Sequence, residues 1–177
     1  VANSFLLPNI VILDGTLAIS SSKYQKANNI LDATAQAVES AWSLNSTNES
    51  IKLSYKALMG ISEAYKKYFK LSDLKSSQIM LNSANIAGQA INITKTTAPH
   101  AWSYGISLEA NIPHGHAIWT TFPKIYNLHF NNQDLLVTDP RGAKHLSEIM
   151  KNINNLIGLD DDTNIINFFE TNEQVCD

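Results

Sequence analysis

Apolar residues recur along most of this chain at the spacing of amphipathic helices. Between residues 22 and 43 the apolar positions follow the 3.6-residue period of one helix face: Tyr24, Ala27, Leu31, Val38 and Trp42. The same period predicts helices across residues 51–69, 74–91, 99–110, 113–128 and 143–156, with a short last helix near 165–169. The pattern therefore predicts a mostly helical chain.

Capping residues and prolines mark where these helices begin and bend. Thr47 or Asn48 can cap the second helix, because a short polar side chain accepts a hydrogen bond from the first turn. Pro99 and Pro140 suit the first turn of a helix, where proline has no hydrogen bond to lose. Pro123 lies inside 113–128, so it predicts a kink in that helix.

One short segment has a different pattern. Residues 9–13 are short, rich in β-branched side chains and followed by Asp14-Gly15, which predicts a strand that ends in a turn. No repeat or linker divides the remainder, and 177 residues are the size of one domain. We therefore predict an all-α helical bundle over residues 1–177, a single domain with a short β segment at its N-terminus.

Composition and charge exclude several classes of protein. The net charge is -3 and no basic stripe is visible, so a nucleic-acid partner is not expected. No apolar run approaches the roughly 20 residues that span a bilayer, so no membrane partner is expected either. The single cysteine, Cys176, cannot form an intrachain disulfide, and it favours a reducing, cytoplasmic location.

The beginning of the chain is unusual. Residue 1 is Val1 rather than methionine, and an apolar stretch follows at once. A complete protein seldom starts inside such a segment, which suggests a domain excised from a longer protein or a proteolytic fragment. Ordinary N-terminal processing is the alternative.

Two pairs of polar residues carry candidate chemistry. Asp32 and Gln36 are four residues apart, so they project from the same helix face within an apolar stretch. His100 and His114 each follow a proline near a helix start, and a helical hairpin can bring both side chains to one point. The alternatives are a hydrogen-bonded pair at the edge of the core and two surface or capping histidines.

Together these four side chains suit a divalent metal ion. One carboxylate, one amide oxygen and two imidazoles form a donor set for a hard-to-borderline cation. Such an ion can polarise a carbonyl or stabilise an alkoxide. Tyr104, one turn after His100, can donate a proton or bind a substrate oxygen, with core packing as its alternative. His116 is a further candidate for the same pocket, or a solvated residue.

The sequence at these residues resembles the iron-containing alcohol dehydrogenases, which belong with the dehydroquinate synthase-like enzymes. The similarity is carried by residues 94–101, by residues 112–117 and by the stretch from Leu31-Asp32-Ala33 to Glu39-Ser40. Residues 42–47 and 138–142 are most similar to the phosphonoacetaldehyde reductase branch. The resemblance covers nearly the whole chain, but only the C-terminal half of such an enzyme.

The resemblance implies a helical domain that holds Fe²⁺ or Zn²⁺ through Asp32, Gln36, His100 and His114. It also implies that NAD or NADP is bound mainly by an N-terminal α/β domain, which is missing from this chain because no glycine-rich nucleotide loop is present. Two residues depart from the family pattern: many members have His at the positions of Gln36 and Tyr104.

We therefore expect the metal-binding catalytic domain of an NAD(P)-dependent alcohol dehydrogenase or aldehyde reductase, inactive as a fragment. The resemblance suggests reduction of phosphonoacetaldehyde to 2-hydroxyethylphosphonate. Lys95 and Arg141 are the candidate phosphonate-binding cations, or ordinary solvated charges. It also implies a homo-oligomer. The alternatives are a non-catalytic helical binding or assembly module left by truncation, and a metal-free family member marked by Gln36.

Overall fold

The computed structural model describes residues 7–132 and 138–157 of the chain. Within these ranges the fold is all-α, as predicted, and it contains no strand. The helices are α1 (Gly15–Ile19), α2 (Lys23–Trp42), α3 (Asn48–Leu71), α4 (Leu74–Thr94), α5 (Ala98–Ala110), α6 (His114–Trp119), α7 (Phe122–Asn131) and α9 (Ala143–Ile157). The short helix predicted near 165–169 lies outside the described residues.

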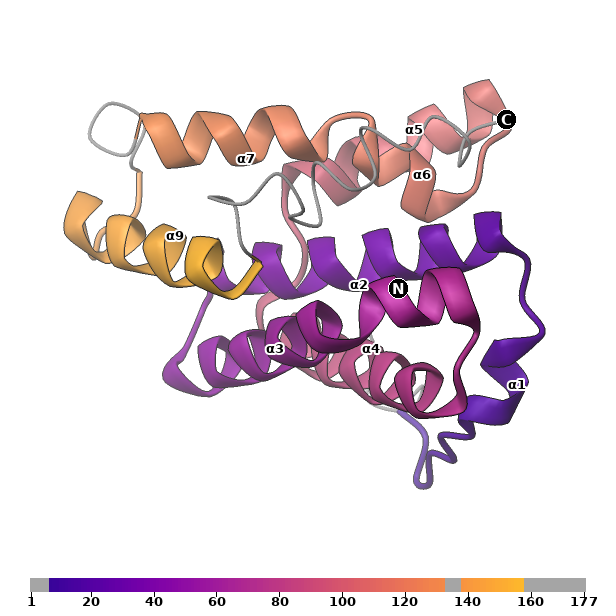
Figure 1. Cartoon of the computed structure of the whole chain (residues 1–177). Helices are drawn as coiled ribbons and strands as arrows, with labels where there is room; N and C mark the ends of the chain where they lie inside the picture. Colours follow the sequence, from indigo (N-terminus) through magenta and orange to yellow (C-terminus); the bar gives the residue numbers. More distant parts are fainter. Residues whose placement is uncertain (1–6, 133–137, 158–177) are drawn as a thin grey trace.

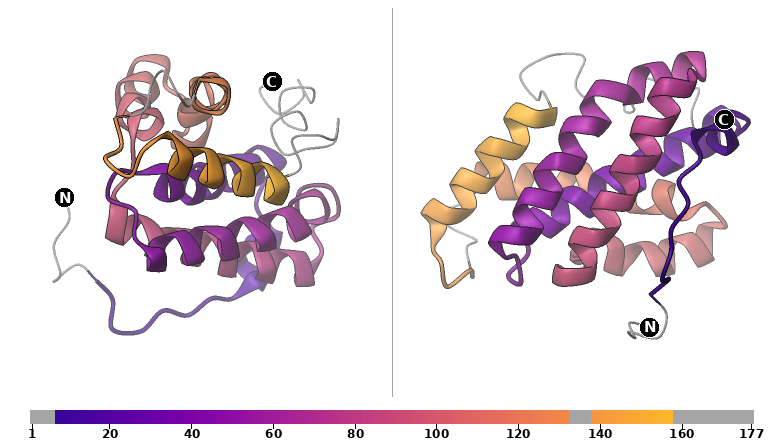
Figure 2. Two further views of the ribbon diagram at one scale, coloured as in Figure 1. Left: turned by 90° about the vertical axis from the view of Figure 1, so that its left-hand side faces the viewer. Right: turned by 90° about the horizontal axis from the view of Figure 1, so that it is seen from below.

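Helix α2 is the centre of the bundle. It lies between the pair α3 and α4 on one side and the helices α5, α6 and α7 on the other (Figure 1). A view from below shows α3 and α4 side by side (Figure 2). Of the 20 residues of α2, 14 are buried, because its many alanines let neighbouring helices pack on more than one of its faces. Polar residues on α2 are therefore held within the bundle.

Side-chain caps fix the ends of the helices that flank α2. Thr47 is the N-cap of α3, as predicted, and it forms a capping box with Ser50. Asp73 caps α4 by accepting a hydrogen bond from the backbone N–H of Ser76. Between these helices Ser72 takes a left-handed conformation with φ of 52°, which turns the chain sharply enough for α3 and α4 to lie antiparallel.

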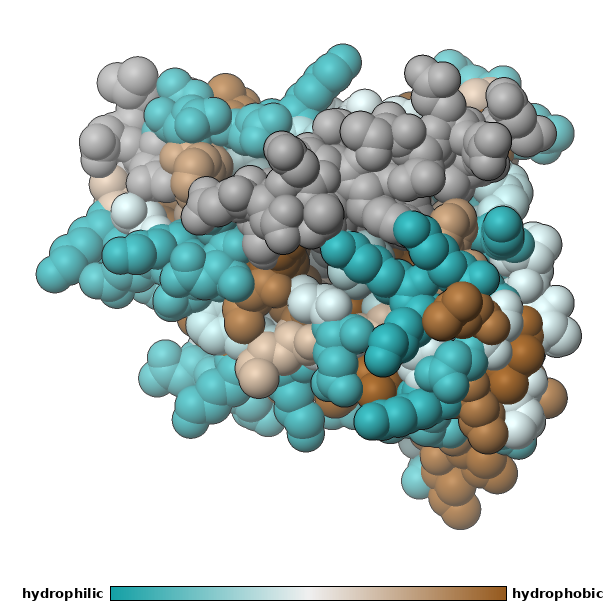
Figure 3. Space-filling view, in the orientation of Figure 1, coloured by the Kyte–Doolittle hydropathy of each residue, from teal (hydrophilic) through white to brown (hydrophobic). Residues whose placement is uncertain are grey.

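The predicted strand at residues 9–13 is wrong. This segment is extended, but none of the described residues pairs with it as a second strand. Its apolar side chains are exposed, with Ile10 at 81% and Ile12 at 87%, and apolar residues gather at this corner of the molecule (Figure 3). The segment is fixed at its end instead, because Gln78 of α4 hydrogen-bonds the carbonyl of Leu13 and the N–H of Gly15.

Two helix boundaries also differ from the prediction. The helix expected across 113–128 with a kink at Pro123 is broken into α6 and α7, and Pro123 lies in the first turn of α7. The hydroxyls of Thr120 and Thr121 bond the carbonyls of Ala117 and Ile118, which ends α6. Pro140 does not begin a helix; it lies in a turn, and α9 starts at Ala143.

The helices also bear on the membrane prediction. Among the described helices, none combines the length and the apolar character that a bilayer-spanning segment requires.

Candidate metal centre

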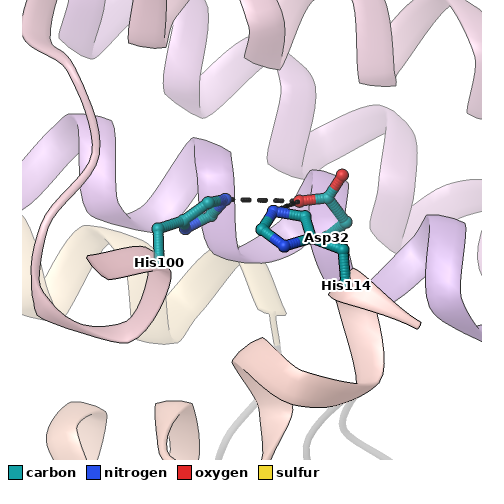
Figure 4. Close-up of side chains that lie close together, drawn as sticks. All are labelled: Asp32, His100 and His114. Atoms are coloured by element: carbon teal, nitrogen blue, oxygen red, sulfur yellow. Dashed lines mark hydrogen bonds and ion pairs between the residues drawn. The ribbon is translucent and has the colours of Figure 1, made fainter. Parts of the chain in front are cut away.

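Three helices bring one carboxylate and two imidazoles to a single point. Asp32 projects from the middle of α2, His100 from the first turn of α5 and His114 from the first residue of α6. Oδ1 of Asp32 lies 3.3 Å from Nε2 of His100 and 4.0 Å from Nε2 of His114. One ligand atom from each residue lies within 4.8 Å of the others. Both rings turn toward the carboxylate (Figure 4).

His100 is held from behind by a buried carboxylate. Nδ1 of His100 lies 2.5 Å from Oε1 of Glu39, and the Glu39 side chain is fully buried. Because an ionised carboxylate only accepts hydrogen bonds, Nδ1 must carry the proton that it donates. Nε2 of a neutral His100 is then left with its lone pair facing Asp32. Such a carboxylate–histidine pair fixes the tautomer and orientation of a metal-binding imidazole.

Glu39 is itself positioned by the start of α5. The backbone N–H and the hydroxyl of Thr97, the N-cap residue, donate to Oε2 of Glu39 at 2.5 and 2.7 Å. The same Thr97 oxygen accepts a hydrogen bond from Nε1 of Trp42 at 2.9 Å. These contacts satisfy a charge that would be costly to bury alone. They tie α2 to α5 one helical turn from the imidazole.

His114 has a different support. The hydroxyl of Ser103 donates to the carbonyl of His100 at 2.7 Å, so its oxygen is free to accept from Nδ1 of His114 at 3.3 Å. This again leaves Nε2 facing the carboxylate. The Tyr104 ring stacks on the His114 ring with 5.6 Å between centroids. His114 is 40% exposed, whereas His100 is 3% exposed, so the centre is open on the His114 side.

The approach of α6 to α2 fixes the place of His114. The backbone N–H of His116 donates to Oδ1 of Asn28 at 2.8 Å. A Cβ on Gly115 would lie only 2.2 Å from the carbonyl oxygen of Asn28, so a side chain at this position would force the helices apart. The glycine is thus required by the close contact of the two backbones.

The cluster strongly changes the titration of His100. Burial lowers the pKa of a histidine, but the hydrogen bonds to Asp32 and Glu39 and the charges of both carboxylates outweigh burial and raise the pKa of His100 to about 9. The ring is therefore protonated at neutral pH when nothing else neutralises the carboxylates. Two negative groups around it make the centre attractive to a cation.

Gln36, the fourth predicted ligand, lies one turn along α2 from Asp32. Both side chains line a cavity of about 300 Å³ between α2 and α4. Gln36 is half-buried. The cavity therefore meets the centre at the two α2 residues, and the imidazoles approach from α5 and α6.

The predicted catalytic residues differ in their surroundings. Tyr104 is 61% exposed and stacks on His114, so it lies beside the centre and does not pack in the core. His116 belongs to another small cluster: its Nδ1 lies 3.0 Å from the hydroxyl of Tyr24. It is not one of the three residues whose ligand atoms converge.

Neither predicted phosphonate-binding cation is held at the centre by a described contact. Lys95 is exposed, and its ammonium donates to the carbonyl of Asn92 at the end of α4. Arg141 bonds the Asp139 carboxylate and the backbone carbonyls of Ser43 and Ser46. Its guanidinium therefore joins the turn before α9 to the turn after α2.

Glu39 was missed as a functional residue by reasoning from the sequence. It lies seven residues after Asp32, so Asp32, Gln36 and Glu39 follow the i, i+4, i+7 spacing of one helix face. A glutamate amid the buried stretch from Ala33 to Trp42 was the available signal, since a buried carboxylate needs a partner.

The donor set fits a divalent cation. The Nε2 atoms of two correctly oriented imidazoles face a carboxylate oxygen, and an amide side chain lies one turn away. Nitrogen and oxygen donors in this mixture suit iron, zinc and similar ions. The buried carboxylate behind His100 is the outer support that such centres commonly have.

Comparison with known proteins identifies the family. The family model for the C-terminal part of the Fe-containing alcohol dehydrogenases matches residues 26–174. This chain belongs to the Fe-containing alcohol dehydrogenase family. The match includes every residue of the centre, and it confirms the resemblance found in the sequence.

Relatives in this alcohol dehydrogenase family are 27% to 28% identical to the chain over the regions that match. The phosphonoacetaldehyde reductase of Streptomyces viridochromogenes is 28% identical over 81% of this chain and 36% of the relative. A 1-propanol dehydrogenase of Citrobacter freundii is 27% identical over 84% of this chain and 39% of the relative. The chain thus spans little more than a third of the length of these relatives.

Solved structures of the same family confirm the fold. The iron-containing alcohol dehydrogenase of Thermotoga maritima has a TM-score of 0.69 and 22% identity over 89% of this chain and 38% of that one. The sulfoacetaldehyde reductase of Bifidobacterium kashiwanohense, solved in complex with NAD⁺, has a TM-score of 0.68 and 22% identity over 86% of this chain and 42% of that one. The helical arrangement is therefore that of this family.

Proposed function

We propose that this chain is the metal-binding domain of an NAD(P)-dependent alcohol dehydrogenase or aldehyde reductase. Asp32, Gln36, His100 and His114 are its metal ligands in this proposal, and the ion is Fe²⁺ or Zn²⁺. The observation that carries the proposal is the convergence of Asp32, His100 and His114 from three helices, with Glu39 holding His100 in the tautomer that a metal requires.

The chain's own residues have distinct tasks in this proposal. When bound, the metal ion would supply Lewis-acid stabilisation of negative charge on the substrate oxygen. Asp32 and the two imidazoles set the position of that oxygen. Tyr104, exposed beside His114, is placed to hydrogen-bond the substrate oxygen or pass it a proton. His116, which contacts the hydroxyl of Tyr24, is the second candidate for donating that proton.

The redox step belongs to a nucleotide cofactor. Aldehyde reduction takes a hydride from NAD(P)H to the carbonyl carbon and a proton to the oxygen, giving the alcohol and NAD(P)⁺. We propose that a preceding domain binds this cofactor, since the relatives are more than twice as long as the matched region. The cytoplasmic location and the homo-oligomer predicted from the sequence stay predictions.

Phosphonoacetaldehyde is one candidate substrate within this class. Similarity to the Streptomyces phosphonoacetaldehyde reductase supports it. Lys95 is the better candidate for a phosphonate contact, because the guanidinium of Arg141 already bonds Asp139, Ser43 and Ser46.

The test begins with metal content. The 177-residue chain, purified after metal-replete expression, should hold close to one iron or zinc, and Asp32→Asn and His100→Gln should each lose it. Glu63→Gln, an exposed carboxylate on α3, is the matched control. Substoichiometric metal in the unaltered chain would contradict the ligand assignment and favour the metal-free alternative.

Activity is tested on the full-length protein that contains this domain. It should oxidise NAD(P)H only when an aldehyde is present, and Asp32→Asn should reduce kcat/KM by at least about a hundredfold, as loss of a metal ligand does. Metal binding without any aldehyde-dependent turnover across a panel of aldehydes would instead favour the non-catalytic module.

A further inference from the structure

The hydrogen bonds behind His100 continue past Glu39 to an indole at the end of α2. Nε1 of Trp42 donates to the hydroxyl oxygen of Thr97 at 2.9 Å. That hydroxyl lies 2.7 Å from Oε2 of Glu39, and Oε1 of Glu39 lies 2.5 Å from Nδ1 of His100. Three consecutive hydrogen bonds therefore join the indole to an imidazole of the centre.

The direction of each bond is fixed by the chemistry of the groups. An indole N–H can only donate, so the Thr97 oxygen accepts from Trp42. The Glu39 carboxylate only accepts, so the single hydroxyl hydrogen of Thr97 points to Oε2. Oε2 then has its two donors in Thr97, and Oε1 is left for His100. Because Trp42 and Glu39 are buried, reversing any bond would leave a buried polar group unpaired.

Thr97 does not use its hydroxyl as N-cap threonines usually do. An N-cap hydroxyl normally accepts a hydrogen bond from the first turn of its helix, as Thr47 does at the start of α3. Among the described residues, the Thr97 side chain makes no such bond to α5. Its place is therefore explained by Glu39 and Trp42, and not by the helix end.

The indole that orients this hydroxyl is held by aromatic packing. Trp42 stacks on His129 and Phe122 of α7, with 4.6 and 5.9 Å between ring centroids. A fixed donor matters here because Thr97 is only half-buried and lines a cavity of about 200 Å³. Without the indole N–H, the hydroxyl could turn toward water in that cavity.

We propose that Thr97 and Trp42 are positioning residues for the metal centre. The indole N–H orients the Thr97 hydroxyl, and the hydroxyl holds Glu39 in the rotamer that fixes His100. Their effect on the metal ion passes through Glu39, so the centre depends on contacts that reach as far as α7. This inference rests on the proposed function, because it takes His100 as a metal ligand.

Substitutions at Thr97 test the hydroxyl alone. Thr97→Val keeps the shape and the backbone donor, and it should lower Zn²⁺ affinity by about tenfold, the lower end of the usual loss for such a support. Thr97→Ser restores the hydroxyl and should bind like the unaltered chain. Thr34→Val is the control, since it removes a buried α2 hydroxyl that bonds only the carbonyl of Ile30. Equal affinities for Thr97→Val and the unaltered chain, by competition with a chromophoric chelator, would overturn the proposal.

A pair of tryptophans tests the indole. Trp42→Phe should weaken Zn²⁺ binding by about three- to tenfold, the loss expected for one hydrogen bond, and should add nothing in a Thr97→Val background. Trp119→Phe is the matched control. Trp119 also stacks on Phe122, but among the described residues its Nε1 has no hydrogen-bond partner. Additive losses in the double variant would overturn the role of Trp42.

A spectroscopic measurement separates positioning from general stability. The Nδ1 proton of His100 lies in the buried bond to Glu39, so it should give a slowly exchanging NMR signal in the metal-free chain. Thr97→Val should shift or broaden this signal and Thr97→Ser should keep it, with folding of both checked by circular dichroism. The same signal in Thr97→Val and the unaltered chain would overturn the proposal.

The two proposals fail separately. A chain that never binds Zn²⁺, but whose His100 signal depends on Thr97, would overturn the proposed function and not the positioning role. A chain that binds one Zn²⁺, with neither affinity nor signal altered in Thr97→Val, would overturn the positioning role and leave the proposed function intact.

Discussion

At the scale of single residues, His100 is held in place by a second carboxylate, Glu39, behind the ring. Asp32 and the two histidines were predicted from their residue types and spacing, and the structure brings all three together. The sequence marks Glu39 only as a carboxylate in a buried stretch that needs a partner, and the packing of α5 against α2 shows that its partners are His100 and Thr97. A metal-binding side chain can be inferred from its residue type and spacing. The residue that supports it by a hydrogen bond is known only once the helices are packed.

Replacing Glu39 tests this support. Glu39→Gln keeps the size of the side chain but removes the charge that holds the Nδ1 proton. We expect the affinity for Zn²⁺ to fall by about 10- to 100-fold, the usual effect of losing such a partner. Competition with a chromophoric chelator measures the affinity, and Glu63→Gln serves as the control. Equal affinities in Glu39→Gln and the unaltered chain would show that Glu39 has no part in metal binding.

The raised pKa of His100 makes the stability of the metal-free chain depend on pH. The ring is protonated up to about pH 9 in the folded state but only to about 6.5 in the unfolded state. Its contribution is therefore fully present below pH 6.5 and is lost as the pH rises toward 9. Among the described residues, Asp32, Glu39 and His114 are the titratable groups that face the ring.

Denaturant unfolding of chelator-treated protein checks this dependence. Between pH 6.5 and 9 the free energy of unfolding should fall by up to roughly 3 kcal/mol more in the unaltered chain than in His100→Gln. Parallel pH profiles for the two proteins would contradict the raised pKa.

At the scale of elements, the helices follow from periodicity and caps, and the errors come from missing partners. The segments 22–43, 51–69 and 74–91, predicted as helices from their apolar periodicity, correspond to α2, α3 and α4, because each apolar face packs on a neighbouring helix of the bundle. The 9–13 segment has strand-forming residues but, within residues 7–132 and 138–157, no strand beside it, and local sequence cannot supply one. α1 is only five residues long, too short for a periodic pattern to reveal.

Two glycine-to-alanine substitutions, one at the contact between α2 and α6 and one away from it, test how close that contact must be. Gly115→Ala should lower the free energy of unfolding by about 1–3 kcal/mol, the usual cost of overpacking, since its Cβ would collide with the Asn28 carbonyl. It should also weaken metal binding, because His114 begins the same helix. A Cβ on Gly105 in α5 meets no other described residue within 4 Å, so Gly105→Ala should be stabilising by roughly 0.5–1 kcal/mol. Thermal unfolding with and without Zn²⁺ distinguishes the two. Similar behaviour of both variants would mean that α6 can move away from α2 without cost.

At the scale of the whole molecule, contacts between distant parts of the sequence decide which polar residues are structural. Arg141 was predicted as a phosphonate-binding residue because a phosphonate needs a cation and residues 138–142 resemble the phosphonoacetaldehyde reductase branch. Its guanidinium bonds Asp139, Ser43 and Ser46, so it links segments that are 95 to 98 residues apart. The sequence identifies a candidate cation, but only the folded chain shows whether its hydrogen-bond donors are already used.

Arg141→Gln separates the two roles. We expect the free energy of unfolding to fall by about 1–3 kcal/mol, since several hydrogen bonds to the α2–α3 turn are lost. Zn²⁺ affinity should stay unchanged. Lys144→Gln, an exposed cation nearby in sequence, should alter neither quantity. A variant as stable as the unaltered chain, but impaired with phosphonoacetaldehyde in the full-length enzyme, would restore the substrate role.

The hydrogen bond from the Trp42 indole to Thr97 gives the domain an internal optical reporter. Trp42 is buried and stacks on His129. Its Nε1 is three hydrogen bonds from the His100 ring, through Thr97 and Glu39. Any cation that draws electron density from His100 will alter the polarity felt by this indole. Emission of Trp42, isolated by replacing Trp102 and Trp119 with Phe, should therefore follow the filling of the centre without an added dye.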